Sequence, residues 1–434
     1  MHECSTTTPV TTTGERVTAP ADRRAAILNI RPPRDGWDAA SLAIMAMYPR
    51  VRDQHIAVFG ESGSGKTVLV SSFYGAAQES SFLKESLFNV VADDIGLGNR
   101  LQKNYVGMRD RAIPPETTRF SATPYSFSVK MKNGDNEAAK KRPFDVLRLV
   151  WHDYPGEWFE EDPGSAEEAA RRVDTFRSLM RSDVAILLVD GQKLLDNAGE
   201  EERYLKSLLW NVRNGLLRLK DDLLENGEPL VEFPRIWIMA LSKADLLPDL
   251  DVFKFRDLII EMTNEDIAQL HEVLKGFVLT PDALSVGEDF MLLSSAKFVP
   301  GKIEVTERVG VDLILPVAAM LPLERRVQWS ERMEIPRKVL EHLADGAETL
   351  AAILIAGQAG RLDKLLVKLP RVGPLIGKGG IPALVAAAKL AESQLKQINA
   401  EALAKRDFLA ATLTQFRLDL DQGEKDDLII KSRR

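Results

Sequence analysis

The amino-acid sequence predicts an α/β fold with a mostly parallel sheet, followed by an α-helical C-terminal region. From about residue 52, short runs rich in β-branched residues alternate with longer helical stretches, as they do in βαβ units. Two neighbouring runs are joined by a segment with an Asn-Gly pair, which is typical of a hairpin turn. Beyond about residue 330 the strand signal fades, and the remaining sequence is rich in Ala, Leu and Lys.

Six of the β-branched runs are predicted strands. In chain order they are HIAVFG (55–60), YSFSVKM (125–131), DVLRLVWHD (145–153), DVAILLVD (183–190), RIWIMAL (235–241) and DFMLLS (289–294). Asn133-Gly134 lies between the second and third runs, so these two strands are expected to pair antiparallel within an otherwise parallel sheet. A helical insertion is expected near residues 78–112, around SSFLKESLFNVV and RLQKNYVGMRDR.

The chain divides into three predicted parts. Residues 1–24 are rich in Thr and poor in apolar residues, so a disordered tail is expected there. Residues 25–325 hold the α/β domain, and residues 326–434 form the helical C-terminal region. Within the latter, residues 361–390 carry six basic side chains and one acidic side chain, interleaved with apolar residues. We favour a helix pair packed on the α/β domain, and contact with an anionic membrane or an acidic partner is the alternative.

The composition excludes several classes of protein. Of the 434 residues, 45% are hydrophobic and 28% are charged, and these ordinary globular values exclude wholesale disorder. The formal net charge of −7 argues against a nucleic-acid platform, so no nucleic-acid partner is expected. Cys4 is the only cysteine, which excludes an intrachain disulfide and a cysteine zinc cluster. Neither a signal peptide nor a run of roughly 18 apolar residues is present, so we expect a cytoplasmic protein.

Residues 60–67 read GESGSGKT and match the phosphate-loop pattern GxxxxGK[ST] at every fixed position. The run follows a predicted strand and opens a helical stretch, which is the context that phosphate binding requires. The backbone N–H groups of such a loop hold phosphate oxygens, a lysine neutralises the β- and γ-phosphates, and a Thr hydroxyl binds Mg²⁺. A plain turn between strand and helix is the alternative. The predicted phosphate-binding residues are Gly60, Ser62, Gly63, Ser64, Gly65, Lys66, Thr67 and Val68, with Lys66 also catalytic and Thr67 also a metal ligand.

A second motif, DxxG, follows the third predicted strand at residues 153–156. Asp153 would hold Mg²⁺ through water, and the backbone N–H of Gly156 would sense the γ-phosphate. Asp-x-x-Gly is common in proteins, so this segment carries weight only through its position at a strand end.

Two further motifs follow the last two predicted strands and are of the kind that reads a guanine base. Ser242, Lys243 and Asp245 lie in SKAD, which fits the pattern [N/T]KxD with Ser at its first position. Asp245 would accept hydrogen bonds from guanine N1–H and its 2-amino group, while the stem of Lys243 lies along the base. Ser295, Ala296 and Lys297 form an SAK segment, whose backbone N–H would meet guanine O6. Adenine lacks the 2-amino group and presents a donor in place of O6, so buried partners here discriminate strongly.

The four motifs in this order resemble the translation-factor-like (TRAFAC) class of P-loop GTPases over roughly residues 52–325. More narrowly, HDYPGEWFEEDP (152–163) is similar to the DYPGEW segment of bacterial YcjX-like and double-GTPase-type proteins. The resemblance implies a Ras-like domain that binds GTP and GDP with Mg²⁺. Two departures bear on function: Ser242 replaces the usual Asn or Thr, and Glu157 stands where many relatives carry a water-orienting Gln.

Catalysis by such a site needs a positioned water and neutralised charge. Glu157 either accepts a hydrogen bond from the attacking water or points outward without a catalytic role. The switch threonine, a catalytic residue and Mg²⁺ ligand, is expected at Thr118, with Thr117 and Thr123 as alternatives. An internal arginine finger is conceivable at Arg109, Arg111 or Arg119, although a solvated arginine is the simpler interpretation of each.

The leading hypothesis is a slow GTP-hydrolysing switch whose C-terminal helices relay nucleotide state to a protein partner. A GTP-gated, self-assembling or membrane-associated scaffold is the first alternative. A P-loop ATPase or kinase is the second, against which the SKAD and SAK segments argue.

Overall fold

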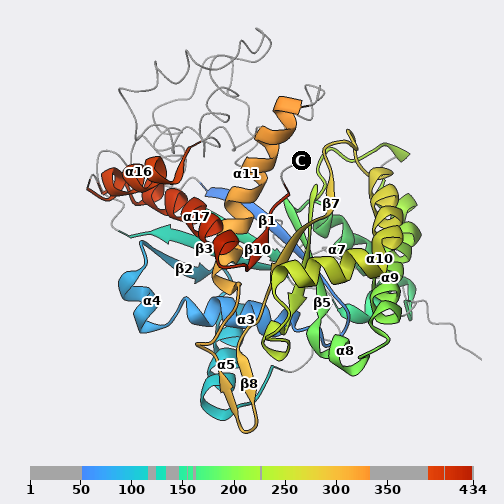
Figure 1. Cartoon of the computed structure of the whole chain (residues 1–434), viewed down its shortest axis with the longest axis horizontal. Helices are drawn as coiled ribbons and strands as arrows, with labels where there is room; N and C mark the ends of the chain where they lie inside the picture. The colour runs from blue at the N-terminus through green and yellow to red at the C-terminus, as the bar shows by residue number, and fades with distance from the viewer. Residues whose placement is uncertain are drawn as a thin grey trace, which may run out of the picture. The chain divides into compact units, whose positions relative to one another are not determined.

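The computed structural model describes the chain in eight stretches (Figure 1). They are residues 51–115, 124–132, 146–153, 155–159, 163–224, 227–332, 390–404 and 406–432. All of them belong to one compact unit that begins at Arg50. The tail predicted for residues 1–24 and nearly all of the basic segment 361–390 lie outside the described residues.

The centre of this unit is an eight-stranded sheet with the order β10-β7-β6-β5-β1-β4-β3-β2. The strands are β1 (Val51–Phe59), β2 (Phe88–Ala92), β3 (Tyr125–Met131), β4 (Val146–His152), β5 (Val184–Asp190), β6 (Ile236–Ser242), β7 (Ser285–Leu292) and β10 (Ile429–Ile430). The five strands from β4 to β7 in this order run parallel. β3 pairs antiparallel with β4, which confirms the expectation drawn from Asn133-Gly134. β2 and β10 pair antiparallel with β3 and β7 at the two edges.

The central strands are buried on both faces, which explains their continuous apolar runs. In β5, Ile186 and Leu188 point into one hydrophobic core, whereas Leu187 and Val189 point into the other. β1 and β6 alternate in the same way. Because side chains of a strand alternate between faces, the apolar residues 56–59, 184–189 and 236–241 of these strands contribute in turn to one core and the other.

Helices cover both faces of the sheet, which confirms the predicted α/β class (Figure 1). One core contains side chains of α3 (Lys66–Ala76), α5 (Ile95–Arg111), α11 (Ile314–Arg332) and α17 (Phe408–Lys425). The other contains side chains of α7 (Ala166–Leu179), α9 (Glu201–Leu223) and α10 (Val252–Lys275). The remaining described α-helices are α4 (Ser80–Glu85), α8 (Gly191–Asp196) and α16 (Glu392–Ala404). Among the helices so described, none is long and apolar enough to cross a membrane.

The region predicted as a helical insertion is only partly helical. α4 and α5 lie within residues 78–112, but β2 separates them and extends the sheet beyond β3. The prediction of helix was therefore wrong for β2. The sequence between α4 and α5 does not show that β2 is a strand, because its strand state depends on its pairing with β3. Asp94 then begins α5, since its carboxylate accepts a hydrogen bond from the backbone N–H of Leu97 at 2.7 Å.

The described part of the chain after the last predicted strand contains three further strands. β8 (Lys297–Val299) and β9 (Lys302–Glu304) form a separate hairpin within the predicted α/β domain, which the sequence analysis did not predict. Within the region 326–434, predicted as helical, β10 returns to the main sheet. α11 runs across the predicted boundary at residue 325, and both α11 and α17 pack in the core that β1 and β5 share.

Candidate functional site

The four sequence motifs meet at one edge of the sheet. β1 and β4 end directly before the phosphate loop and the DxxG segment. β6 ends at Ser242, the first residue of the SKAD segment, and β7 ends shortly before the SAK segment. These strands are parallel, so their carboxyl ends lie at the same edge. Ligands of open parallel sheets bind in the crevice outside this edge.

The phosphate loop is folded as a phosphate-binding concavity. Gly63 and Gly65 have φ angles of 79° and 92°, a left-handed conformation that other residues rarely adopt. Lys66 is buried, and its Nζ donates to the carbonyl oxygens of Gly60 at 2.7 Å and of Glu61 at 3.0 Å. The lysine ammonium therefore lies against the loop itself, where it can reach a phosphate group held by the backbone.

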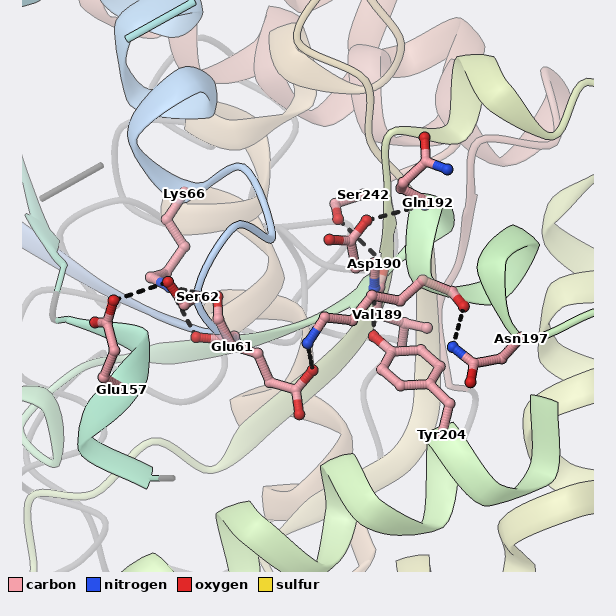
Figure 2. A network of polar contacts seen from close by, with 12 residues as sticks. Glu61, Ser62, Lys66, Glu157, Val189, Asp190, Gln192, Asn197, Tyr204 and Ser242 are labelled. Atoms are coloured by element: carbon pink, nitrogen blue, oxygen red, sulfur yellow. Dashed lines mark hydrogen bonds and ion pairs between the residues drawn. The ribbon is translucent and has the colours of Figure 1, made fainter. Parts of the chain in front are cut away.

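The DxxG segment packs directly on this loop. A Cβ atom added to Gly156 would lie 2.2 Å from the backbone nitrogen of Ser62, so only glycine allows this approach. Next to it, Ser62 Oγ donates to Glu157 Oε1 at 2.8 Å (Figure 2). In the structure Glu157 thus points toward the phosphate loop and not outward.

The phosphate loop, Asp153 and Glu157 line a cavity of about 270 Å³, which we call the phosphate-end cavity. Thr67 contributes a hydroxyl and Asp153 a carboxylate to its lining, and hard oxygen donors of this kind are the ligands that Mg²⁺ prefers. Among the described residues, no group of three or more His, Cys, Asp or Glu side chains could hold a metal ion. A Mg²⁺ ion here fits the common arrangement in which one or two protein ligands act together with substrate phosphates and water.

A second cavity of about 250 Å³ adjoins the first, and we call it the base-end cavity. Asp245 lies in its lining with both carboxylate oxygens held. Oδ1 accepts from Ser294 Oγ at 2.6 Å, and Oδ2 accepts from the backbone N–H of Phe298 at 3.3 Å. These donors fix the orientation of the carboxylate before any base arrives.

Ser242 and Ser295 also line the base-end cavity. The hydroxyl of Ser242 donates to the carbonyl oxygen of Val189 at 3.2 Å, so it ties the SKAD segment to the end of β5. Ser72 of α3 donates to the carbonyl oxygen of Ser295 at 2.8 Å, which connects the helix after the phosphate loop with the SAK segment.

Not every predicted residue lines the site. Ala296 is fully buried in a small hydrophobic cluster with side chains of α5. Lys297 Nζ pairs with Glu307 at 3.1 Å. Among the described residues, Lys297 is not part of the lining of either cavity. Thr118, Thr117, Thr123 and Arg119 lie outside the described residues.

The two described arginines proposed as an internal finger differ in their surroundings. Arg109 is held by Asp110 at 2.7 Å and by Glu79 at 2.9 Å. Arg111 lines a neighbouring cavity of about 660 Å³ together with Thr67.

A polar network behind the site was missed by the sequence analysis (Figure 2). Glu61 Oε2 lies 2.6 Å from Lys193 Nζ of α8, and Asp190 Oδ2 lies 2.8 Å from Lys243 Nζ. Asp190 also begins α8, because its carboxylate accepts from the backbone N–H of Gln192 at 2.9 Å. A signal for Asp190 was present, since it ends a predicted strand, whereas nothing local marks Glu61 and Lys193 as partners.

Comparison with known proteins identifies the family. The model of the family Double-GTPase 2 matches residues 54–279, just over half of the chain. The chain belongs to this family. Membership confirms the resemblance to double-GTPase-type proteins, and the matched region includes the phosphate loop, the DxxG segment and the SKAD segment. A search of the curated proteins gives no match.

Solved structures give distant similarities to GTPase domains. The Ski7 GTPase-like domain of S. cerevisiae bound to GTP is 17% identical with a TM-score of 0.26, over 60% of this chain and 45% of that chain. The same domain bound to GDP and inorganic phosphate is 16% identical with a TM-score of 0.26, over 60% of this chain and 48% of that chain. Era in complex with MgGDPNP and a segment of 16S ribosomal RNA is 12% identical with a TM-score of 0.24, over 66% of this chain and 70% of that chain. The chain thus spans about half the length of the Ski7 chains that it matches.

Proposed function

We propose that this member of a GTPase family is a Mg²⁺-dependent molecular switch that binds GTP and GDP and hydrolyses GTP slowly. One observation carries the proposal. The phosphate-end and base-end cavities share five lining residues, so they form one cleft. The shared residues are Ser64, Gly65, Val68, Lys243 and Phe298. Lys66 lies at one end of this cleft and Asp245 at the other, which is the separation of functions that a nucleoside triphosphate requires.

Base selection rests on Asp245. Its carboxylate, already oriented by Ser294 and Phe298, accepts hydrogen bonds from a base edge that carries two adjacent donors, as guanine does. Adenine lacks the 2-amino group and cannot supply that pair, so the carboxylate would face the base without the two hydrogen bonds that guanine gives it. The stem of Lys243 lines both cavities and packs along the base, while its ammonium stays with Asp190.

Hydrolysis rests on the phosphate end. Lys66 and the loop N–H groups neutralise the β- and γ-phosphates, and Glu157 accepts a hydrogen bond from the attacking water. When bound, Mg²⁺ supplies further charge neutralisation, with Thr67 as a direct ligand and Asp153 as a ligand through water.

Relay of the nucleotide state to a protein partner is supported by contacts of the C-terminal elements with β7. Arg325 of α11 forms a buried ion pair with Asp289 of β7, and the backbone N–H of Ser432 donates to the same carboxylate at 2.9 Å. β7 leads into the SAK segment, so a movement there on nucleotide binding would reach α11 and the residues after α17. The recipient is a second protein or another copy of this chain.

Calorimetric titration of nucleotide-free protein with GTP, GDP and ATP in Mg²⁺ tests the proposal. We expect guanine nucleotides to bind at least 100-fold more tightly than ATP. Asp245→Asn should weaken GTP by about 100-fold and improve binding of xanthosine nucleotides, because the new amide pairs with a 2-oxo group. Asp249→Asn is the matched control, since this exposed residue lies in the same loop. Equal or tighter binding of ATP would overturn the guanine assignment and favour an ATPase or kinase.

A further inference from the structure

The contact between Ser62 and Glu157 leaves one carboxylate oxygen unused. Glu157 Oε1 accepts from Ser62 Oγ at 2.8 Å. Glu157 Oε2 is shielded from solvent and has no hydrogen-bond partner in the described part of the chain. Both residues line the phosphate-end cavity together with Lys66 and Asp153. A buried acceptor without a donor is unfavourable by itself, so this oxygen is suited to a donor that enters with the ligand.

The backbone on either side of Glu157 is firmly held. Gly156 lies against the phosphate loop, as the 2.2 Å approach of its added Cβ to Ser62 N shows. Trp158 packs on α7, where the guanidinium of Arg172 lies 5.5 Å from its ring centroid and donates to its carbonyl oxygen at 3.2 Å. With both neighbours fixed, the direction of the Glu157 carboxylate depends on its own side-chain torsions, and within the described contacts Ser62 is what restrains them.

We propose that Ser62 is a positioning residue for GTP hydrolysis. It holds Glu157 so that Oε2 of the carboxylate accepts a hydrogen bond from the attacking water. The proposal rests on the proposed function. The water oxygen forms a bond to the γ-phosphorus, and the bond from that phosphorus to the β–γ bridging oxygen breaks, leaving its electron pair on GDP. One water proton passes to Glu157 Oε2 and then to the released phosphate, so the carboxylate is regenerated.

The hydroxyl of Ser62 also reduces the repulsion between the Glu157 carboxylate and the γ-phosphate. A negative side chain near the γ-phosphate repels it, whereas the neutral Gln of many relatives does not. A hydrogen bond donated to Oε1 spreads part of the carboxylate charge and strengthens as that charge is exposed to a low-dielectric cleft. Serine and glutamate therefore act as a pair, and the loss of either should have the same consequence.

The same contact could instead lock the site in a closed, inactive form. In that case removal of the hydroxyl would free Glu157 and speed hydrolysis. The two interpretations predict opposite changes in one rate constant, so a single set of variants separates them.

Single-turnover hydrolysis of GTP and equilibrium affinities for GTP and GDP should be measured on the full chain. Ser62→Ala should lower the hydrolysis rate constant about tenfold while both affinities stay within about twofold. Ser62→Thr keeps the hydroxyl and should stay within about threefold of the parent rate. Glu157→Gln should lower the rate at least tenfold, and adding Ser62→Ala to it should cause no further loss. Ser207→Ala, at an exposed serine of α9, is the matched control.

The outcomes separate the inference from the function on which it rests. A parent chain that binds no GTP overturns the proposed function itself. A parent chain that hydrolyses GTP, together with an unchanged rate for Ser62→Ala, overturns only the positioning role. A faster Ser62→Ala variant also overturns it, in favour of the inactive lock, and so do independent effects of the two substitutions.

Discussion

The buried ion pair between α11 and β7 offers a demanding test of the fold. Arg325 and Asp289 have side chains that are 1% and 0% exposed. The Asp289 carboxylate also accepts from Ser285 Oγ at 2.8 Å and from the backbone N–H of Ser432 at 2.9 Å. Burial raises the pKa of Asp289, which Arg325 opposes. Replacement of Arg325 by alanine removes the only formal positive charge that the structure gives this carboxylate among its described hydrogen-bond partners.

The size of the effect follows from the burial of both groups. Breaking a buried ion pair by deleting one partner costs about 3–5 kcal/mol, because the remaining charge stays buried without compensation. Arg325 also donates to the carbonyl oxygen of Ser432 at 2.7 Å, so its loss also removes one of the contacts that hold the residues after β10. We therefore expect Arg325→Ala to lower the free energy of unfolding by at least about 3 kcal/mol, a large part of the 5–15 kcal/mol typical of a domain.

Urea denaturation followed by tryptophan fluorescence measures this loss. Arg109→Ala is the matched control: its guanidinium pairs with Asp110, but the Arg109 side chain is 41% exposed, so its loss should cost less than about 1 kcal/mol. Asp289→Leu combined with Arg325→Met should recover most of the stability, since an apolar pair replaces two buried charges. A loss below about 1 kcal/mol for Arg325→Ala would refute the reasoning.

Three further substitutions test the site and the sheet. Gly156→Ala should lower the single-turnover rate of GTP hydrolysis at least tenfold, because the new Cβ would lie 2.2 Å from the nitrogen of Ser62; a parental rate would contradict this. Lys193→Ala should weaken GTP binding about tenfold in calorimetry, since Glu61 would carry an uncompensated charge beside the phosphate loop. Glu61→Gln in the same chain should restore the affinity. Burial and the neighbouring His55 lower the pKa of His152 from 6.5 to about 4. The unfolded state therefore binds more protons between these values, so stability is full above pH 6.5 and falls by up to about 3 kcal/mol toward pH 4. His152→Gln should flatten that part of the urea-derived profile, and superimposable profiles would contradict the assignment.

The bounds of the central strands could be predicted closely, because strands that are buried on both faces consist of continuous runs of apolar residues. Residues 184–189 and 236–241 are continuously apolar, and they make up nearly all of β5 (Val184–Asp190) and β6 (Ile236–Ser242). β2 could not be recognised in the same way, since it is a five-residue edge strand with Val91 exposed. The strand state of such a segment depends on the partner strand beside it and not on its own residues.

Some parts of the site could be predicted from local sequence and others could not. Each of the four motifs is a short continuous segment. Because each follows a predicted parallel strand, the sequence alone was enough to place them at one edge of the sheet. The pair of Asp190 and Lys243 depends on the register of β5 against β6, in which Asp190 lies opposite Ser242. The pair of Glu61 and Lys193 likewise joins two loops that are distant in sequence. The β8–β9 hairpin, by contrast, carried a usable signal in Pro300-Gly301, because Gly301 has a φ angle of 75° within the turn.

The position of β10 also bears on how the chain reaches its native state. Ser432 and Asp289 are 143 positions apart in sequence, and β7 is synthesised long before β10 can pair with it. During that interval the edge of β7 has unpaired backbone groups next to Phe290 and Met291, which are buried in the finished fold. Contacts of such long range also slow folding, and apolar strand edges left open are sites of aggregation. We therefore expect the newly made chain to depend on protection of this edge until residues 429–432 are in place.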